Sequence, residues 1–147
     1  MKEIAKILID KNLTISVCES CTAGGLAYEL TKLSGSSKWF DGGLITYTNQ
    51  SKSKLLGINI SFIEIYGPVS KEVSKEMVYS CLNKLKSNIA ISITGYAESK
   101  NNNGLVFISL SNNSKIETYT LNVKENRDKN RIYIINKSLK YLLKFLI

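Results

Sequence analysis

The sequence predicts an α/β fold, a three-layer α/β/α sandwich with a mixed, mostly parallel sheet of about five strands. Short β-branched runs alternate with amphipathic segments of helical period. The run "IAISIT" at 89–94 is apolar throughout, as expected for a central strand covered on both faces. Two adjacent runs, 104–111 and 115–123, predict a hairpin and therefore a late antiparallel piece. This order is typical of helices packed on both faces of a sheet.

The remaining elements follow from local patterns. Predicted helices span residues 2–11, 22–33, 51–57, 71–86 and 127–146. The other predicted strands span residues 13–18 and 43–48, and the segments 34–43 and 58–68 are expected to be irregular. Ser70 is the expected N-cap of the fourth helix, and Gly57 ends the third. The inward faces of the last two helices are expected to carry Val73, Met77, Cys81 and Leu85, and Ile132, Ile135, Leu139, Leu142 and Leu146.

Composition limits the class of protein. The 147 residues are expected to form one domain, 1–147, with an ordinary apolar share of 44%. No stretch reaches the roughly 20 apolar residues of a membrane span, and three cysteines do not suit a disulfide framework, so we expect a cytoplasmic protein. The net charge of +8 is spread along the chain without a dense basic run, so we expect no nucleic-acid partner.

The chain contains no histidine. This excludes Ser-His-Asp and Cys-His nucleophile pairs, histidine general bases and histidine metal ligands. Acid–base catalysis near neutral pH would therefore need lysine, tyrosine, cysteine or a carboxylate.

Polar residues follow three of the predicted strands. They fall in the segments 18–22, 47–52 and 94–98, the last of which begins with Thr94 and Gly95. Because ligands bind beyond the carboxyl ends of strands in open α/β sheets, we expect these segments to form one pocket.

The stretch "VCESCTAGGLA" allows two chemistries. Cys18 and Cys21 have the spacing of a redox dithiol, but no cis-proline candidate follows and further zinc ligands are lacking. Ser20 precedes a helix, where it is either an N-cap or a nucleophile beside amides that bind an oxyanion. Without histidine, such a nucleophile needs a lysine of lowered pKa, and Lys52 is expected in the loop after the second strand. An ordinary solvated lysine is the alternative.

Four motifs resemble, in order and spacing, the CinA C-terminal domain family. They are "ESCTAGGLA", "SGSSKWFDGGLITYTNQSKSKLLGI", "GPVSKEVSKEM" and "AISITGYA". Stand-alone members of this family are nicotinamide-nucleotide amidases. The resemblance implies hydrolysis of nicotinamide mononucleotide to nicotinic acid mononucleotide and ammonia, without metal or cofactor. It also suggests a homo-oligomer.

The resemblance assigns roles by position. Ser20 matches the nucleophile and Lys52 the general base, and Tyr47 is expected to position one of them. The amides of Thr22 and Ala23 are expected to bind the oxyanion. The other expected substrate-binding residues are Glu19, Gly24, Thr94, Gly95, Arg127 and Arg131. Of these, Arg127 and Arg131 are the candidates for binding the phosphate.

One stretch departs from the family pattern. Where the family has T-G-I-A-G-P, this chain has "TGYAES", which places Tyr96, Glu98 and Ser99 at the expected pocket, and Ala23 replaces a family glycine. A carboxylate near a phosphate would repel it. The alternatives to the amidase are therefore a non-catalytic relative that serves as a binding or assembly module, and a redox protein that uses Cys18 and Cys21.

Overall fold

The computed structural model describes residues 1–98 and 104–147. Ser99, which was singled out above, and the asparagine run 101–103 lie outside the described residues. The helices are α1 (Lys2–Asp10), α2 (Gly25–Thr31), the 3-10 helix η1 (Ser36–Lys38), α3 (Asn49–Leu56), α4 (Ile60–Tyr66), α5 (Lys71–Leu85) and α6 (Arg127–Leu146). The strands are β1 (Ile15–Glu19), β2 (Phe40–Ile45), β3 (Ile89–Gly95), β4 (Leu105–Asn112) and β5 (Lys115–Asn122).

The five strands form one mixed sheet in the order β2-β1-β3-β4-β5. β1 pairs in parallel with β2 and β3, whereas β3–β4 and β4–β5 are antiparallel. This confirms the predicted α/β class and the late antiparallel piece. Glu19, the last residue of β1, pairs with both Ile45 and Ile93, so the carboxyl ends of three strands lie side by side.

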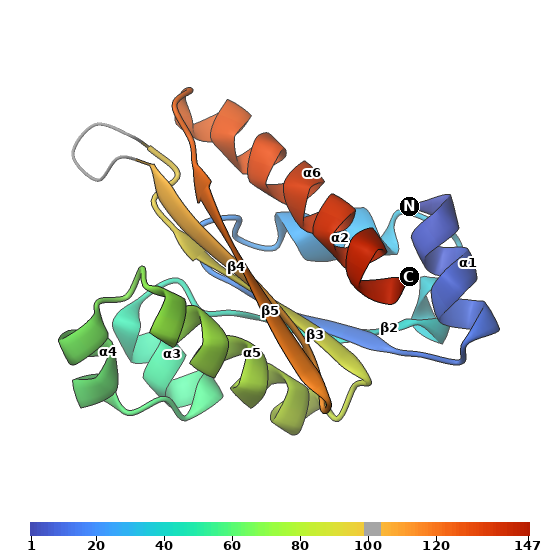
Figure 1. Ribbon diagram of the computed structural model, residues 1–147, viewed down its shortest axis with the longest axis horizontal. Coiled ribbons are helices and arrows are strands. Elements are labelled where there is room, and N and C mark those ends of the chain that lie inside the picture. Colours follow the sequence, from blue (N-terminus) through green and yellow to red (C-terminus); the bar gives the residue numbers. More distant parts are fainter. Residues whose placement is uncertain (99–103) are drawn as a thin grey trace.

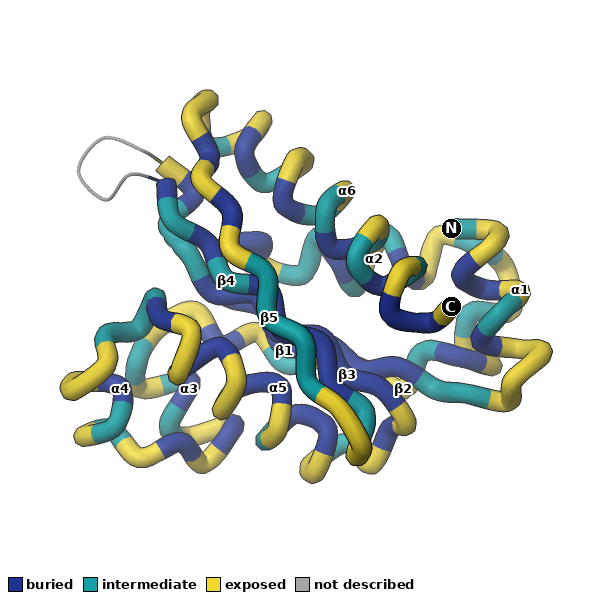
Figure 2. The backbone as a smooth tube through the Cα atoms, viewed as in Figure 1, coloured by how far each residue is buried: buried dark blue, intermediate teal, exposed yellow. Residues whose placement is uncertain are grey.

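Helices cover both faces of the sheet. α1, α2 and α6 lie on one side and α3, α4 and α5 on the other, which gives the predicted three layers (Figure 1). The sheet is largely buried between helices whose outer faces are exposed (Figure 2). One apolar cluster, which includes Ile15, Val17 and Ile91, packs under α1, α2 and α6, and a smaller one, which includes Cys18 and Ala90, packs under α3, α4 and α5.

Small hydroxyl residues connect α5 to the sheet. The Ser74 hydroxyl lies 3.1 Å from that of Ser92 on β3 and 2.8 Å from that of Ser109 on β4. All three are fully buried, so these mutual hydrogen bonds offset the cost of their burial. The start of α5 is thereby fixed relative to the carboxyl end of β3.

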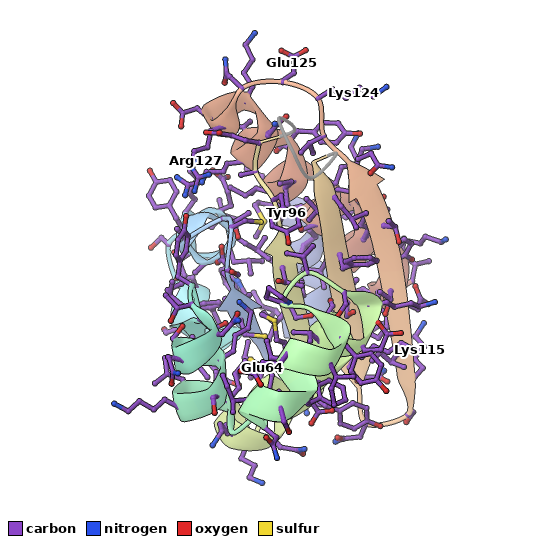
Figure 3. All side chains as sticks on the ribbon, turned by 90° about the vertical axis from the view of Figure 1, so that its left-hand side faces the viewer. Glu64, Tyr96, Lys115, Lys124, Glu125 and Arg127 are labelled. Carbon is purple, nitrogen blue, oxygen red and sulfur yellow. The ribbon has the colours of Figure 1, made fainter. Side chains whose placement is uncertain are left out.

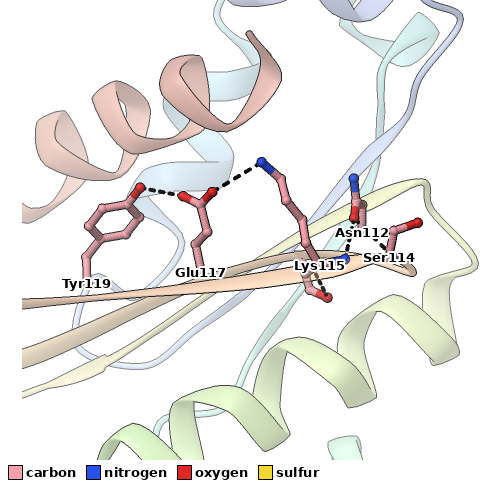
Figure 4. A network of polar contacts seen from close by, with 6 residues as sticks. Asn112, Ser114, Lys115, Glu117 and Tyr119 are labelled. Atoms are coloured by element: carbon pink, nitrogen blue, oxygen red, sulfur yellow. Dashed lines mark hydrogen bonds and ion pairs between the residues drawn. The ribbon is translucent and has the colours of Figure 1, made fainter.

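The β4–β5 hairpin closes through a turn at 113–114, as predicted. The Asn112 side chain accepts hydrogen bonds from the amides of Ser114 and Lys115 (Figure 4). On β5, Glu117 accepts from both Lys115 and Tyr119, which places a polar network on the helix α6 side (Figure 4).

Four sequence predictions need correction. The second helix begins at Gly25 rather than at residue 22, because Ala23 and Gly24 have positive φ values of 52° and 94°. The segment 58–68 contains helix α4, which Asn59 caps through the Ser61 amide. The second strand ends at Ile45, three residues before its predicted end at 48.

The fourth correction concerns the last helix, whose bounds are as predicted. Ile132 is 62% exposed, because the buried face is set by Asn130, Ile134, Ser138, Leu142, Phe145 and Leu146. Sequence periodicity placed an isoleucine on this face, whereas polar Asn130 and Ser138 occupy it.

None of the helices in residues 1–98 and 104–147 has the length and apolar character that crossing a membrane requires.

The N-cap of α5 gives a test of the fold. The Ser70 hydroxyl accepts from the Val73 amide at 3.1 Å and donates to the Gly67 carbonyl at 2.9 Å. Ser70→Ala should lower the free energy of unfolding by about 1 kcal/mol in urea titration, because it leaves a helix amide unpaired. Ser80→Ala, within the same helix, is the control and should change it by less than about 0.5 kcal/mol. Equal effects of the two variants would contradict the capping role.

Candidate active site

A cavity of about 380 Å³ opens at the carboxyl ends of β1 and β3. It lies where the sequence predicted that separate segments meet. Its lining residues are Ser20, Cys21, Tyr47, Asn49, Lys52, Pro68, Val69, Thr94, Gly95, Tyr96, Ala97, Glu98 and Arg127. Figure 3 shows Tyr96 and Arg127 at one end of the molecule, with Glu125 farther out on the turn that leads into α6.

Ser20 and Lys52 meet at the floor of this cavity. The Lys52 Nζ atom lies 3.3 Å from Ser20 Oγ and donates to the Thr46 carbonyl oxygen at 3.1 Å. Ser20 is 7% exposed and Lys52 is 2% exposed. The amine is therefore held in one place against the hydroxyl, and bulk water has little access to either group.

Burial lowers the pKa of the Lys52 ammonium from its ordinary value of 10.5, because the charged form loses hydration. No acidic side chain forms an ion pair with Lys52 among the described residues. At moderate pH a larger fraction of such a lysine is present as the neutral amine than of a solvated lysine, and only the neutral amine can act as a general base.

Lys52 lies in helix α3, which overlaps the helix predicted at 51–57, and not in the loop after the second strand where the base was expected. Thr48 is the N-cap, and its hydroxyl accepts from the Ser51 amide while the Ser51 hydroxyl accepts from the Thr48 amide. This capping box fixes the first turn of the helix. Lys52 follows directly, so its direction is set by a helix rather than by a flexible connection.

Glu19 supports the turn that carries Ser20. Its fully buried carboxylate accepts hydrogen bonds from the amides of Gly24, Leu26 and Ala27 at 3.1, 3.1 and 2.8 Å. A carboxylate there satisfies amides at the start of α2 and interacts favourably with the helix dipole. Glu19 is not among the cavity-lining residues, so the structure gives it this capping role in place of the expected substrate contact.

The expected oxyanion site is altered in one respect. The Ala23 amide donates to the Ser20 carbonyl oxygen at 3.0 Å, so the turn itself occupies this donor. The Thr22 amide donates to no acceptor within residues 1–98 and 104–147. The positive φ of Gly24 accounts for a glycine at this position. A Cβ on Gly25 would lie 2.5 Å from the Ile135 side chain on α6. Neither glycine requires a ligand.

Arg131 holds the peptide next to the nucleophile. Its Nε atom donates to the Cys21 carbonyl oxygen at 2.8 Å, and the residue does not line the cavity. Since the Cys21 carbonyl and the Thr22 amide belong to one planar peptide, this contact also fixes the direction of the Thr22 N–H. The contact positions the loop, which differs from the expected phosphate binding.

Tyr47 and Arg127 form a pair at the cavity rim. The Arg127 guanidinium donates to the Tyr47 hydroxyl, and no hydrogen bond joins Tyr47 to Ser20 or Lys52. Tyr47 is 49% exposed. The tyrosine therefore orients Arg127, whereas the sequence had led us to expect that it positions Ser20 or Lys52. Arg127 remains positioned to meet a ligand.

The opposite wall comes from β3 and the start of α5. The Thr94 hydroxyl donates to the Pro68 carbonyl at 2.7 Å, which joins these two segments. Gly95 lines the cavity, but a Cβ there would lie 2.8 Å from the Val106 Cα atom on β4. Close packing of β3 against β4 therefore requires glycine at this position.

Asn49 lies in the segment 47–52 that was expected at the pocket, but the sequence did not indicate Pro68 and Val69 as lining residues, or Asn130 as a support. Asn130 is buried at the start of α6, and its Nδ2 atom donates to the Ala97 carbonyl oxygen at 2.8 Å. The signal in the sequence that could have indicated this support was the polar Asn130 on the apolar face of α6. Pro68 and Val69 lay in a segment predicted to be irregular.

The cysteines do not form a redox pair. The Cys18 thiol donates to the Met77 carbonyl on the α5 side, whereas Cys21 packs into the apolar cluster on the opposite face. Burial raises the pKa of the Cys21 thiol to about 12 and that of Cys18 well above its usual range. Thiolates are the reactive form, so this arrangement disfavours dithiol chemistry. Within the described residues no metal-binding cluster of His, Cys, Asp or Glu is found.

The left-handed turn after Ser20 gives a second test. Ala23 is exposed and has a φ of 52°, a conformation that strains any residue with a Cβ. Ala23→Gly should raise the free energy of unfolding by roughly 0.5 to 1 kcal/mol, net of the greater entropy of the unfolded glycine chain. Ala27→Gly, inside α2, is the matched control and should lower it by about 1 kcal/mol. Destabilisation by Ala23→Gly would show that the turn is not strained.

Comparison with known proteins identifies relatives over the whole chain. A model of the CinA C-terminal domain matches residues 1–146. A CinA-like protein of Endomicrobium trichonymphae is 36% identical over 97% of this chain, and one of Rippkaea orientalis is 37% identical over 88%. The chain spans only about a third of the length of these relatives, 34% and 32%.

Solved structures share the fold over nearly their full length. A competence or damage-inducible protein from Enterobacter asburiae superposes with a TM-score of 0.94 at 26% identity, covering 99% of this chain and 95% of that one. A competence/damage inducible protein from Agrobacterium tumefaciens gives a TM-score of 0.88 at 28% identity, covering 97% and 93%. With the family match and the ordered motifs, these similarities show that the chain belongs to the CinA C-terminal domain family.

Proposed function

We propose that this domain is an amidohydrolase that releases ammonia from the carboxamide of nicotinamide mononucleotide by a Ser–Lys mechanism, in pyridine-nucleotide salvage. The observation that carries the proposal is the contact of 3.3 Å between Lys52 Nζ and Ser20 Oγ at the floor of a cavity. The lowered pKa of Lys52 supports a base, and the three buried free thiols suit a reducing cytoplasm.

In the first half-reaction, neutral Lys52 takes the hydroxyl proton as Ser20 Oγ bonds to the carboxamide carbon. The carbonyl oxygen becomes an oxyanion, for which the Thr22 amide, oriented through Arg131, is the proposed donor. The intermediate collapses with cleavage of the C–N bond. Protonated Lys52 gives its proton to the departing nitrogen, so ammonia leaves and an acyl-serine remains.

In the second half-reaction, water attacks the acyl carbon and gives a proton to Lys52. Collapse breaks the bond to Ser20 Oγ, which regains the proton, and the carboxylic acid product leaves. Because Thr46 accepts a hydrogen bond from Lys52 Nζ, the amine keeps its place through both steps. The substrate would extend towards Arg127 at the rim, which is the remaining phosphate candidate.

A second candidate is a non-catalytic binding module of the same family. It is favoured by Glu98, whose carboxylate lines the cavity to which a phosphate would have to come. The two candidates differ in turnover, since both retain the fold and the cavity.

The experiment measures ammonia release from nicotinamide mononucleotide by the wild type, Ser20→Ala and Lys52→Met. Each substitution should lower kcat/KM at least about 10³-fold, because nucleophile or base is lost. Lys54→Met is the matched control on an exposed position of α3 and should retain activity within about twofold. Turnover that survives in Ser20→Ala would contradict the mechanism, and no turnover by the folded wild type would favour the binding module.

The pH dependence follows from the state of Lys52. Neutral lysine is the active form, so kcat/KM should rise as pH increases through the Lys52 pKa and level off below pH 10.5. A rate that falls over this range as the lysine loses its proton would contradict its role as a base.

A further inference from the structure

The outer wall of the cavity carries one acidic and one basic side chain. Glu98, from the segment after β3, and Arg127, from the start of α6, both line it. Glu98 is exposed, whereas Ser20 and Lys52 are buried at the floor. A carboxamide that reaches Ser20 therefore leaves the rest of the substrate near the outer wall, within the influence of these two charges.

The two charges have opposite effects on a phosphate. Arg127 attracts a dianion at the rim and Glu98 repels it, and Lys52 adds no charge in the neutral form that catalysis needs. The charged lining therefore gives phosphate no net attraction. The pyridinium ring is common to the riboside and the nucleotide, so its attraction to Glu98 and to the aromatic surface of Tyr47 and Tyr96 does not distinguish the two ligands, and the phosphate alone does.

The net charge of +8 does not reverse this balance. Most of the lysines lie outside the cavity lining, and ionic screening at physiological salt limits their influence to about 8 Å. The nearest charges therefore determine whether a charged ligand group at the rim is attracted or repelled.

We propose that Glu98 determines substrate charge preference by cancelling the attraction of Arg127 for a phosphate, so that this domain binds the cationic pyridinium riboside, which lacks a phosphate, at least as tightly as the phosphorylated nucleotide. This inference rests on the proposed amidase function and identifies its substrate class. It concerns the position at which the chain departs from the motif of its family, a carboxylate at residue 98.

The experiment measures dissociation constants by calorimetry on a Ser20→Ala background, which prevents turnover. The ligands are nicotinamide riboside and nicotinamide mononucleotide. The parent should bind the riboside at least as tightly as the nucleotide, and Glu98→Gln should shift the affinity ratio towards the nucleotide by about three- to tenfold. Glu125→Gln removes the same charge outside the cavity lining, at an exposed site paired with Lys129 (Figure 3), and should shift the ratio less than about twofold.

The inference would be overturned if the parent bound the nucleotide more tightly than the riboside and Glu98→Gln left the affinity ratio of the two ligands unchanged. It would also be overturned if neither ligand bound. Ammonia release by the Ser20-containing protein is measured separately with both ligands. If neither ligand releases ammonia, the amidase function is overturned. The affinity ratios would still decide the role of Glu98.

Discussion

The arrangement of this domain's active site depends on one buried amine. Lys52 is placed between the Ser20 hydroxyl and the Thr46 carbonyl at the point where three strands end, and its charge has no buried carboxylate to pair with among the described residues. Burying a lysine without a counter-ion is costly unless the lysine gives up its proton. The result is an amine of lowered pKa beside a serine hydroxyl, the arrangement on which the proposed function rests.

The surrounding elements hold Ser20 and Lys52 in position. Glu19 caps α2 and so shapes the turn after Ser20, the capping box of α3 directs Lys52, and the Thr94 hydroxyl joins β3 to the wall at Pro68. Arg131 completes the set from the last helix, because it holds the peptide that follows Ser20. Each of these contacts joins segments distant in sequence or fixes a helix start, so the chemistry depends on the whole sandwich.

Much of the fold was predictable because apolar periodicity reports burial directly. The hairpin, the α5 cap at Ser70 and the bounds of α6 were predicted from local pattern alone. The roles of Glu19, Arg131 and Asn130 were not, because each acts through a backbone group that only the tertiary structure brings near. Tyr47 shows the same limit: its neighbour in space, Arg127, is 80 positions away in sequence. Ser20 and Lys52 were predicted as a pair because both match motif positions in the family resemblance and because the absence of histidine left few other bases, and the structure places their side chains in contact.

The most direct test of this account is the titration of Lys52 itself. The Lys52 Cε resonance is followed by NMR against pH in protein with labelled lysine, assigned by its loss in Lys52→Met, with Lys54 as the exposed reference. The account predicts a midpoint for Lys52 below 10.5, since burial disfavours the ammonium. Co-titration of the two lysines, or a midpoint of Lys52 above 10.5, would contradict the claim that this residue is the base.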